Sequence, residues 1–473
     1  MLRQLRLKNF KGWRDTAPVR MAPLTIFFGT NSSGKSSIEQ FLLMLKQTVN
    51  SSDRKMVLYP GDANTPVNLG SFTDLIYGHD VRNKLEFSLL WELTPPLEVS
   101  DRRSNLNVSG DQLEFSASIS GGNAKYPYPF LYDFRYRLLM NAAEEMRVGI
   151  ERNEAPAGVQ YDLKASPYKL VRHKMRAWSL GFPRKFYGFP DEVSVYYQNA
   201  DFVQDFSLEM ERLLQSISHI GPLRSKAERL YSWSGGEPED VGYAGEKTIG
   251  ALLAAKGRRL GAGKGKRSKS LQELVAAKLQ QLELIDAFDV KEISKNRNEF
   301  EVKVKTGGSA SWVDLPDVGF GVSQVLPVIV QCYYAQPRSI LFIEQPELHL
   351  HPRAQAHLAD LFIDVLSSRE NGEARNIQLI VETHSEHFLH RLQRRIAESS
   401  SEHPIVSSQV AGYFARHADG ESRLDPLQFD AYGAICNWPT NFFGDTMGDL
   451  REMSKAGVLR RSAQRPQGAG TGP

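Results

Sequence analysis

The residues with the clearest chemical meaning stand together near the amino terminus. They fit the pattern G-x-x-x-x-G-K-[ST] and are, in order, Gly29, Thr30, Asn31, Ser32, Ser33, Gly34, Lys35 and Ser36, with Ser37 directly after them. Glycines at such positions let backbone N–H groups turn inward onto phosphate oxygens, beside a helix terminus that favours negative charge. Lys35 would then reach the terminal phosphates of a nucleotide, and the Ser36 hydroxyl would bind Mg²⁺. The pattern predicts a site for ATP and Mg²⁺; the alternative interpretation is a Gly/Ser turn before a helix.

A second group of chemically useful side chains follows an apolar run far along the chain. Ser339 to Ile343 is typical of a buried strand, and it ends in Glu344-Gln345-Pro346-Glu347. A carboxylate at the end of a buried strand beside a phosphate loop can hold the Mg²⁺ shell or polarise a water molecule. We therefore expect Glu344 to serve the Mg²⁺ ion, with Gln345 and Glu347 as further catalytic candidates. The alternative is a charged turn that ends a strand.

The elements around these residues have the order that a phosphate loop needs. Leu24 to Phe28 is a short apolar run that ends at Gly29, and Ile38 to Leu45 is apolar at helical spacing. Strand, loop and helix therefore follow one another. Ile377 to Val381 is a further strand of the buried type, separated from the first by a helix from about Pro352 to Ser367.

The middle of the chain is less regular. Residues 84–220 are rich in aromatic and β-branched residues, which predicts mainly strands with short helices. Ser207–Ile217 and Leu271–Leu284 are predicted amphipathic helices. Lys256–Lys269 is rich in glycine and lysine and is predicted to be a mobile surface loop. Its basic side chains could contact phosphate backbones or could simply be solvated, and they are Arg258, Arg259, Lys264, Lys266, Arg267 and Lys269.

The composition of the 473-residue chain is that of an ordinary soluble protein, with 41% hydrophobic and 24% charged residues. The formal net charge is +3, so no global field requires a nucleic-acid partner. Two cysteines, Cys332 and Cys436, are too few for a disulfide framework and fit a reducing compartment. No apolar run approaches the roughly 20 residues that a membrane-spanning helix needs. We expect a cytoplasmic protein with no membrane association.

A resemblance emerges at the second strand. The segment Leu341–Pro352, LFIEQPELHLHP, resembles the Walker B and D-loop segment of ABC/SMC-type ATPases, above all the bacterial AAA-family branch related to RecF and to the ATPase domain of OLD nucleases. In that pattern Glu344 matches the Walker B acid, and Leu348 to His351 match the D-loop. The position that normally holds the catalytic glutamate is Gln345 here. The resemblance therefore leaves the general base open, with Glu347 and His384 as candidates.

Two more segments are similar to motifs of this branch. Asp317–Gln324, DVGFGVSQ, resembles the signature motif, although Ser323 stands where glycine is usual. The resemblance implies that Gly321, Ser323 and Gln324 bind the γ-phosphate held by an opposite subunit. Val381–Ser385, VETHS, resembles the switch-histidine segment, which would place His384 near the γ-phosphate; a lone histidine can equally be structural.

Shorter matches cover much of the remaining chain. They are Gly70–Asp74, His219–Arg224 and Trp438–Phe443, the last similar to a C-terminal domain of unknown function that often accompanies such ATPases. Asp74 lies in the region where a Q-loop glutamine is expected. Arg224 is a candidate phosphate-proximal arginine, and a surface ion pair is the alternative.

The sequence thus predicts an α/β fold, a P-loop ABC-type ATPase head with a β-rich N-terminal lobe and a helical signature lobe. We divide it into 1–220, an N-terminal ATPase lobe with the phosphate loop and a β-rich insertion, and 221–300, a helical lobe with the basic loop. Residues 301–400 form a C-terminal ATPase lobe with the signature, Walker B, D-loop and switch-histidine segments. Residues 401–473 form a C-terminal extension with a disordered tail.

Several functions agree with these motifs. The resemblance implies a slow ATPase whose heads are joined face to face by ATP and Mg²⁺ in a homodimer or higher homo-oligomer. It would act as a switch, sensor or scaffold for a separate effector protein in anti-phage defence or DNA repair. The alternatives are an ATP-dependent clamp on DNA, an OLD-like nuclease component and a transporter ATPase. The long insertion and the divergent signature oppose the transporter.

Two kinds of metal centre are not expected. His349, His351 and His357, or His384 and His387, could suggest a structural metal, but no cysteine joins them. A nuclease would need converging carboxylates, and no D-x-D pair at a strand end occurs after His387. Asp419 and Glu421 flank Gly420 in a predicted hairpin turn. The acidic residues of this part are Glu398, Glu402, Asp419, Glu421, Asp425, Asp430, Asp445, Asp449 and Glu452. We expect the chain alone to cut no nucleic acid.

Overall fold

The computed structural model describes residues 1–101, 106–122, 128–155, 158–174, 178–261, 267–294, 297–308, 311–401, 403–439, 442 and 451–456. The chain forms two compact units, Met1–Cys436 and Asn437–Pro473. In the second unit the rings of Trp438 and Phe442 pack edge to face, with centroids 5.3 Å apart. Thr440, Asn441 and Phe443 of the Trp438–Phe443 match lie outside the described residues.

The centre of the first unit is a six-stranded sheet. Its order is β10 (Ile217–Ile220), β17 (Ile340–Glu344), β20 (Gln378–Glu382), β4 (Leu24–Gly29), β21 (Val410–Ala418) and β22 (Glu421–Leu427). All neighbours are parallel except β21 and β22, which form an antiparallel hairpin. The continuous apolar runs of β4, β17 and β20 are buried on both faces, as parallel strands covered by helices require. The carboxyl ends of these strands therefore meet at one edge of the sheet.

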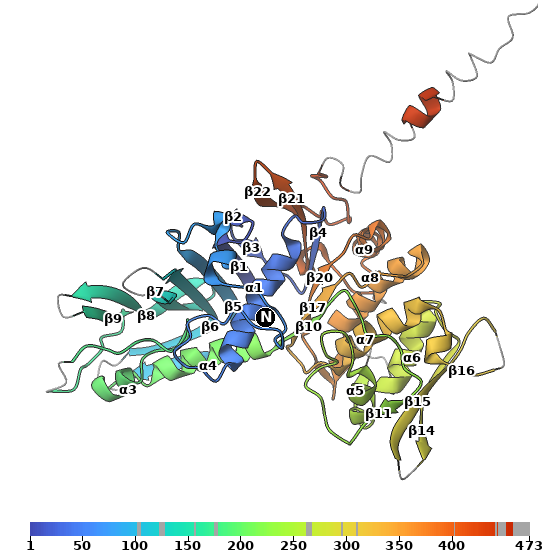
Figure 1. Ribbon diagram of the computed structural model, residues 1–473, viewed down its shortest axis with the longest axis horizontal. Helices are drawn as coiled ribbons and strands as arrows, with labels where there is room; N and C mark the ends of the chain where they lie inside the picture. The colour runs from blue at the N-terminus through green and yellow to red at the C-terminus, as the bar shows by residue number, and fades with distance from the viewer. Residues whose placement is uncertain are drawn as a thin grey trace, which may run out of the picture. The chain divides into compact units, whose positions relative to one another are not determined.

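Helices cover both faces of this sheet. Figure 1 shows it between α1 (Lys35–Asn50) on one side and α7 (Phe320–Tyr334), α8 (Pro352–Leu366) and α9 (Glu386–Glu398) on the other. The predicted phosphate-loop helix and the helix after Pro352 are thereby confirmed. Asp360 of α8, which is 1% exposed, joins α8 to α9 through ion pairs with Arg391 at 3.0 Å and Arg395 at 2.6 Å.

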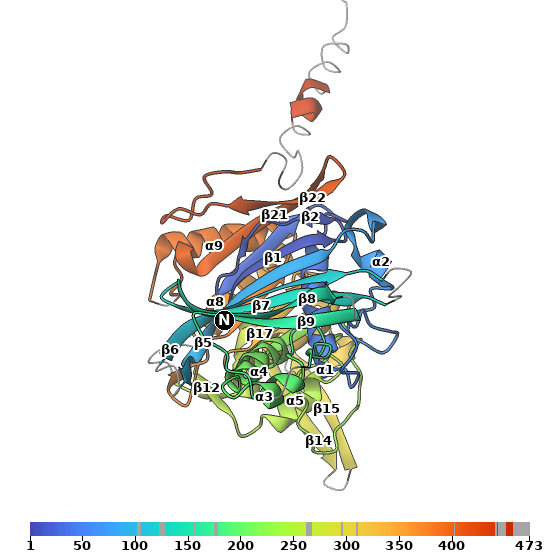
Figure 2. The same ribbon diagram turned by 90° about the vertical axis from the view of Figure 1, so that its left-hand side faces the viewer.

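The β-rich lobe is a second, eight-stranded sheet. Its strands follow the order β2-β1-β5-β6-β7-β8-β9, β3 also pairs with β1, and all pairs are antiparallel. The strands are β1 (Leu2–Phe10), β2 (Trp13–Asp15), β3 (Val19–Arg20), β5 (Leu85–Asp101), β6 (Leu106–Ser120), β7 (Phe130–Met140), β8 (Ala143–Ala155) and β9 (Gly158–Ser166). The strands predicted after residue 84 are confirmed, and Figure 2 shows β22 beside β2.

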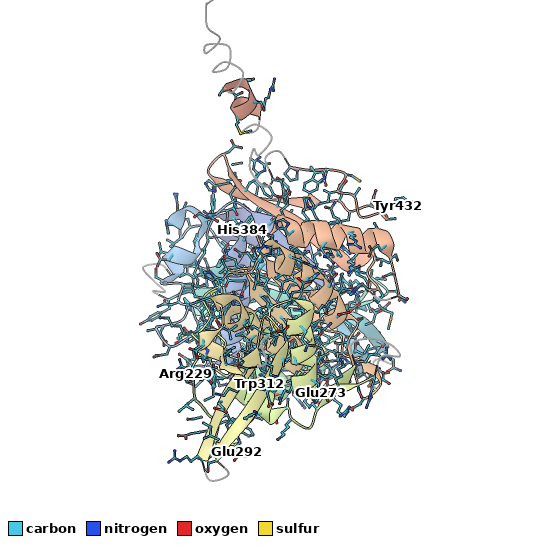
Figure 3. The ribbon with its side chains drawn as sticks, turned by 90° about the vertical axis from the view of Figure 1, so that its right-hand side faces the viewer. Arg229, Glu273, Glu292, Trp312, His384 and Tyr432 are labelled. Atoms are coloured by element: carbon cyan, nitrogen blue, oxygen red, sulfur yellow. The ribbon has the colours of Figure 1, made fainter. Side chains whose placement is uncertain are left out.

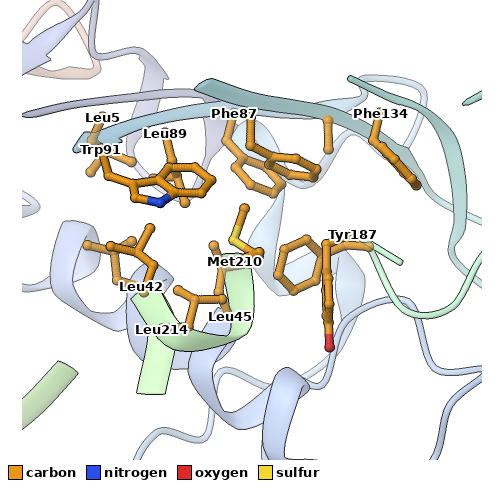
Figure 4. Close-up of a cluster of buried hydrophobic side chains, with 14 of the residues drawn as sticks. Leu5, Leu42, Leu45, Phe87, Leu89, Trp91, Phe134, Tyr187, Met210 and Leu214 are labelled. Atoms are coloured by element: carbon orange, nitrogen blue, oxygen red, sulfur yellow. The ribbon is translucent and has the colours of Figure 1, made fainter. Parts of the chain in front are cut away.

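One face of this second sheet packs on α1 and α4 (Phe202–Gln215). Leu89 and Trp91 of β5 meet Leu42 of α1 and Leu214 of α4 in a buried cluster (Figure 4). Full burial of such a side chain stabilises a fold by about 1.5–3 kcal/mol. The same cluster includes Phe342 of β17, so one core joins the β-rich lobe, the phosphate-loop helix and the central sheet.

The signature lobe contains strands as well as helices. Its helices α5 (Thr248–Ala254) and α6 (Leu271–Gln281) pack against α7. One sheet is built from β11 (Tyr231–Ser232), β14 (Ala287–Ser294), β15 (Arg297–Lys305) and β16 (Val313–Asp314). Another is built from β12 (Arg259–Gly261), β13 (Lys269–Ser270), β18 (Arg369–Glu370) and β19 (Glu373–Ala374). The short helices α2 (Phe72–Leu75) and α3 (Glu192–Tyr196) belong to the N-terminal part of the chain.

The prediction of a mobile surface loop over Lys256–Lys269 is wrong near both ends of the range, where the chain forms short strands. β12 and β13 pair with each other there, and β12 also pairs with β18. Arg258 donates to both carboxylate oxygens of Glu370, at 2.9 and 2.8 Å, so its charge is already neutralised within the fold. Lys264 and Lys266 lie outside the described residues.

The predicted extension 401–473 also contributes to the core. β21 pairs with the phosphate-loop strand β4, so this part of the extension completes the central sheet. The hairpin turn predicted at Gly420 is confirmed, since β22 begins directly after it. Among the described helices, none combines the length and the apolar character needed to span a membrane.

The two cysteines provide a chemical test of this fold. Cys332 of α7 is fully buried, and burial raises the pKa of its thiol to about 12, whereas Cys436 is exposed. Because the thiolate is the reactive form, an aromatic disulfide reagent at about pH 8 should titrate one thiol in the folded protein and both after denaturation. Cys436→Ser should leave no reactive thiol in the folded state. Rapid labelling of Cys332 in the native protein would contradict this packing.

Candidate functional site

The loop Gly29–Ser36 has the backbone geometry of a phosphate cradle. Gly29 has φ 137° and Gly34 has φ 93°, a region that favours glycine. A Cβ added at Gly29 would lie 2.0 Å from the Ala415 carbonyl oxygen of β21, and one at Gly34 would lie 2.9 Å from Ser422 Oγ. Both glycines are therefore required by conformation and by close approach of the β21–β22 hairpin. α1 begins directly after them, and its amino terminus favours an anion.

The side chain of Lys35 folds back over this loop and contacts its backbone. Its Nζ donates to the carbonyl oxygens of Gly29 at 3.0 Å and Thr30 at 2.8 Å, and lies 3.9 Å from Glu382 Oε1. Burial lowers the pKa of Lys35, and the Glu382 carboxylate acts in the opposite direction. The ammonium group thus lies over the loop, with backbone carbonyls as its present partners.

Ser36 contacts a carboxylate that the sequence analysis did not select. Its Oγ donates to Glu382 Oε2 at 2.8 Å. Burial raises the pKa of Glu382, and the Ser36 hydroxyl and Lys35 oppose that shift. A signal was present in the sequence, because the strand Ile377–Val381 ends in Glu382 just as Ser339–Ile343 ends in Glu344.

Glu344 lies at the end of β17 and is supported by two further residues that sequence reasoning missed. His219 Nε2 lies 2.9 Å from Glu344 Oε1 and also forms an ion pair with Glu39 of α1. Burial by itself lowers the pKa of His219, but Glu39 and Glu344 outweigh it and raise the pKa to about 9. The raised pKa favours a positive charge on His219 beside Glu344, whereas burial raises the pKa of Glu39 to about 7.

These three groups could also hold a metal ion, since each offers a ligand atom within 4.8 Å of the others. Metal-bound histidine normally donates its other ring nitrogen to a partner. His219 Nδ1 is buried and has no hydrogen-bond partner among the described residues. The cluster therefore lacks the second partner that a metal-bound His219 would normally have. The histidines near the D-loop and His384 form no such group in the part of the chain that the structure describes.

Arg224 fixes the turn after β17. It is 7% exposed and donates to the carbonyl oxygens of Glu344 at 2.6 Å and Gln345 at 3.0 Å. Burial lowers the pKa of Arg224 to about 10. The alternative of a surface ion pair is therefore wrong for Arg224. Gln345 itself has φ 43°, and its N–H donates to the Glu382 carbonyl at 2.7 Å.

A hydrogen bond joins the Glu347 side chain to the backbone of His384. Glu347, 8% exposed, accepts a hydrogen bond from the His384 N–H through Oε1 at 2.7 Å. The carboxylate thus holds the loop after β20. Partial desolvation of the ring, and then the positive charge of Lys35, lower the pKa of His384. Figure 3 shows His384 well apart from Trp312 and Glu292 of the signature lobe.

The signature segment, Asp317–Gln324, makes its contacts away from the phosphate loop of the same chain. Ser323 Oγ donates to the Phe320 carbonyl at 2.8 Å, Gln324 is 4% exposed, and a Cβ on Gly321 would lie 3.1 Å from the His349 carbonyl. Phe320 is 58% exposed, and its ring packs edge to face on His349 of the D-loop match at 5.5 Å. Among the described residues, no hydrogen bond or ion pair joins this segment to the phosphate loop. The structure therefore brings Lys35, Ser36, Glu344, Glu347 and His384 into one neighbourhood and leaves the signature outside it.

Other predicted positions have local partners. Asp74 accepts from the N–H and hydroxyl of Ser71, both at 2.7 Å, in the capping box of α2. Asp419 pairs with Arg423 at 2.9 Å and Asp425 with Arg416 at 2.6 Å, so these acids do not converge on a metal position.

Three family models match parts of this chain. A family described as "AAA domain, putative AbiEii toxin, Type IV TA system" matches residues 157–389, the "AAA ATPase domain" family matches residues 1–80, and "Protein of unknown function (DUF3696)" matches residues 405–453. The chain thus contains AAA-family ATPase domains. An "ATP/GTP phosphatase" of Helicobacter pylori is 21% identical over 404 residues, which is 85% of this chain and 90% of that protein.

Solved structures of SMC heads are similar at low identity. The SMC head domain from Thermotoga maritima has 11% identity and a TM-score of 0.39, covering 90% of this chain and 99% of the other. An SMC head with an extended coiled coil bound to a ScpA domain, from Pyrococcus furiosus, has 11% identity and a TM-score of 0.40, covering 96% and 99%.

The His219 cluster predicts a specific kinetic effect. In His219→Gln the amide keeps a hydrogen-bond donor but removes the charge between Glu39 and Glu344, so Glu344 loses its fixed position. We expect kcat for ATP hydrolysis to fall by about tenfold or more, with KM changed by less than about threefold. His390→Gln, the same change at a ring that is 55% exposed on α9, is the control. Equal losses in both variants, or a loss confined to KM, would contradict a positioning role.

Proposed function

We propose that this chain of AAA-family ATPase domains binds ATP with Mg²⁺ at Gly29–Ser36, hydrolyses it slowly and uses the cycle as a switch between associated copies of itself. The observation that supports this best is the contact of Lys35 and Ser36 with Glu382 at the carboxyl end of β20, where Glu344 of β17 is its strand partner. The residues present fit the nucleotide and its ion, because the loop offers backbone N–H groups at the start of α1, the Lys35 ammonium group, and the Ser36 hydroxyl beside the Glu382 carboxylate.

Each residue at the site has a defined task in this proposal. Backbone N–H groups of the loop and the start of α1 bind phosphate oxygens, and Lys35 exchanges two carbonyl partners for phosphate. Ser36 and Glu344 would hold Mg²⁺, which when bound neutralises charge on the phosphates. Arg224 fixes the Gln345 turn, and Glu347 holds the backbone that carries His384 close to the terminal phosphate.

The proposal of slow ATP turnover rests on the amide side chain of Gln345. An amide cannot accept the proton of the attacking water as a carboxylate does. Glu347 and His384 would assist the water instead: burial raises the pKa of the Glu347 carboxyl group, and only its Oε1 accepts from the His384 N–H. ATP would therefore persist at the site long enough for the bound state to carry a signal.

Association of two copies is proposed from the position of the signature segment. Gly321 and Ser323 lie at the exposed start of α7, whose amino terminus favours an anion, and make no contact with the phosphate loop of the same copy among the described residues. A second copy could present this helix terminus to the γ-phosphate, which completes the site only when ATP is bound.

The biological output is proposed to lie in a separate effector protein, in anti-phage defence or DNA repair. The family match that mentions a Type IV TA system supports the defence role. Direct binding to DNA is favoured less, because Arg258 of the basic stretch is neutralised by Glu370.

Removal of the lysine charge tests nucleotide binding. Lys35→Ala eliminates the ammonium group that would face the terminal phosphates, so calorimetric titration with ATP and Mg²⁺ should show affinity at least about a hundredfold weaker. Lys46→Ala, on the same helix, is the matched control. Undiminished affinity in Lys35→Ala would place the nucleotide elsewhere.

The association can be tested at Ser323. Ser323→Arg places a long side chain at the exposed start of α7, so it should block approach of a second copy while leaving ATP binding intact. Light scattering with a non-hydrolysable ATP analogue should show a larger species for the parent protein than for the variant. A particle mass that changes neither with nucleotide nor with the substitution would rule out this association.

A further inference from the structure

Glu382 engages both functional side chains of the phosphate loop at once. Its Oε2 accepts from Ser36 Oγ at 2.8 Å, while its Oε1 lies 3.9 Å from Lys35 Nζ. The residue is 8% exposed and ends β20, the strand between the phosphate-loop strand β4 and the Glu344 strand β17. No other carboxylate among the described residues makes a hydrogen bond or ion pair with Lys35 or Ser36.

The sheet register places this carboxylate beside Glu344. Glu344 and Glu382 are direct partners across the parallel β17–β20 pair, and neighbouring strands lie about 4.8 Å apart. Side chains alternate along a strand, so Glu382 shares its face with Ile380, and Glu344 shares its face with Phe342. Ile380 and Phe342 both belong to the core cluster that includes α1. Both carboxylates therefore point to the α1 side of the sheet, where Ser36 lies.

The two carboxylates have different cationic partners. Glu344 is paired with the His219 imidazolium, which Glu39 shares. Glu382 has Lys35. When Lys35 turns to the phosphates of ATP, Glu382 loses that partner while further negative charge arrives next to it. A buried carboxylate without a nearby cation is costly, so Glu382 would then either take up a proton or gain another cation in place of Lys35.

We propose that Glu382 is a second acidic group of the divalent-cation site, alongside Glu344, and that it makes ATP binding depend on the cation. This inference rests on the proposed function. Ser36 positions the carboxylate at the place where the ion is bound, and the exchange of Lys35 for the ion couples the two ligands. Glu382 also supplies, one strand away, a negative charge that Gln345 lacks.

The opposite interpretation is that Glu382 only fixes Ser36 and Lys35 in the nucleotide-free fold. The two interpretations differ in the effect of the cation. A purely structural Glu382 would affect nucleotide affinity equally with and without Mg²⁺. A cation ligand would repel the nucleotide in the absence of Mg²⁺ and favour it in its presence.

The test is a titration of the full chain with a fluorescent ATP analogue, once with Mg²⁺ and once with EDTA. The ratio of the two dissociation constants measures the dependence on the cation. In Glu382→Gln we expect this ratio to fall by about tenfold or more, with tighter binding than the parent in EDTA. Glu386→Gln makes the same change at a 50% exposed side chain four residues further on and should keep the parent ratio.

Each result has a separate meaning. A parent protein that does not bind the analogue would refute the proposed function. A parent protein that binds with a strong cation dependence, which Glu382→Gln retains, would overturn the role of Glu382 alone. Should Glu382→Gln fail to fold, Glu382→Asp keeps the charge but shortens its reach. Electron paramagnetic resonance titration with Mn²⁺ and ATP should then show weaker Mn²⁺ binding in Glu382→Asp, and unchanged Mn²⁺ affinity would overturn the proposal.

Discussion

The parallel register of β4, β20 and β17 is the constraint on which the site depends. It brings the ends of three strands, which are far apart in the sequence, to one edge of a buried sheet. The phosphate loop follows β4, and the carboxylates of Glu382 and Glu344 end the other two strands. The apolar alternation that buries Phe342 and Ile380 against α1 also fixes which way both carboxylates point. Packing of the core and geometry of the site are therefore set by the same residues.

The carboxyl edge of the central sheet also requires a balance between its buried negative and positive side chains. Glu39, Glu344 and Glu382 are desolvated close to one another, and buried carboxylates are stable only when paired. His219 and Lys35 supply the two positive charges, one on each side. The His219 pair joins α1 to β10 and β17. The Lys35 pair must open for phosphate to bind, so the two halves of the site differ in how they respond to ligand.

The sequence predicted most of the phosphate loop, the Walker B strand and the helices beside them, because each is a local pattern with a fixed spacing. Glu382 was missed although it ends an apolar strand, since the resemblance drew attention to His384 two residues later. Glu39 and His219 could not be predicted, because their pairing depends on helix α1 lying over β10. The ends of the basic stretch were misassigned for the same reason: Arg258 meets Glu370 only through the β12–β18 pairing, which joins segments about a hundred residues apart.

A crystal structure with Mn²⁺ and a non-hydrolysable ATP analogue would test the central claim most directly, because Mn²⁺ is located by its anomalous scattering. The account predicts phosphates in the Gly29–Ser36 loop and an ion at about 2.0–2.2 Å from Ser36 Oγ, facing the carboxylates of Glu344 and Glu382. The Lys35 ammonium group should contact the phosphates and should no longer lie beside Glu382. Phosphates bound away from this loop, or an ion away from both strand ends with Lys35 still on Glu382, would contradict it.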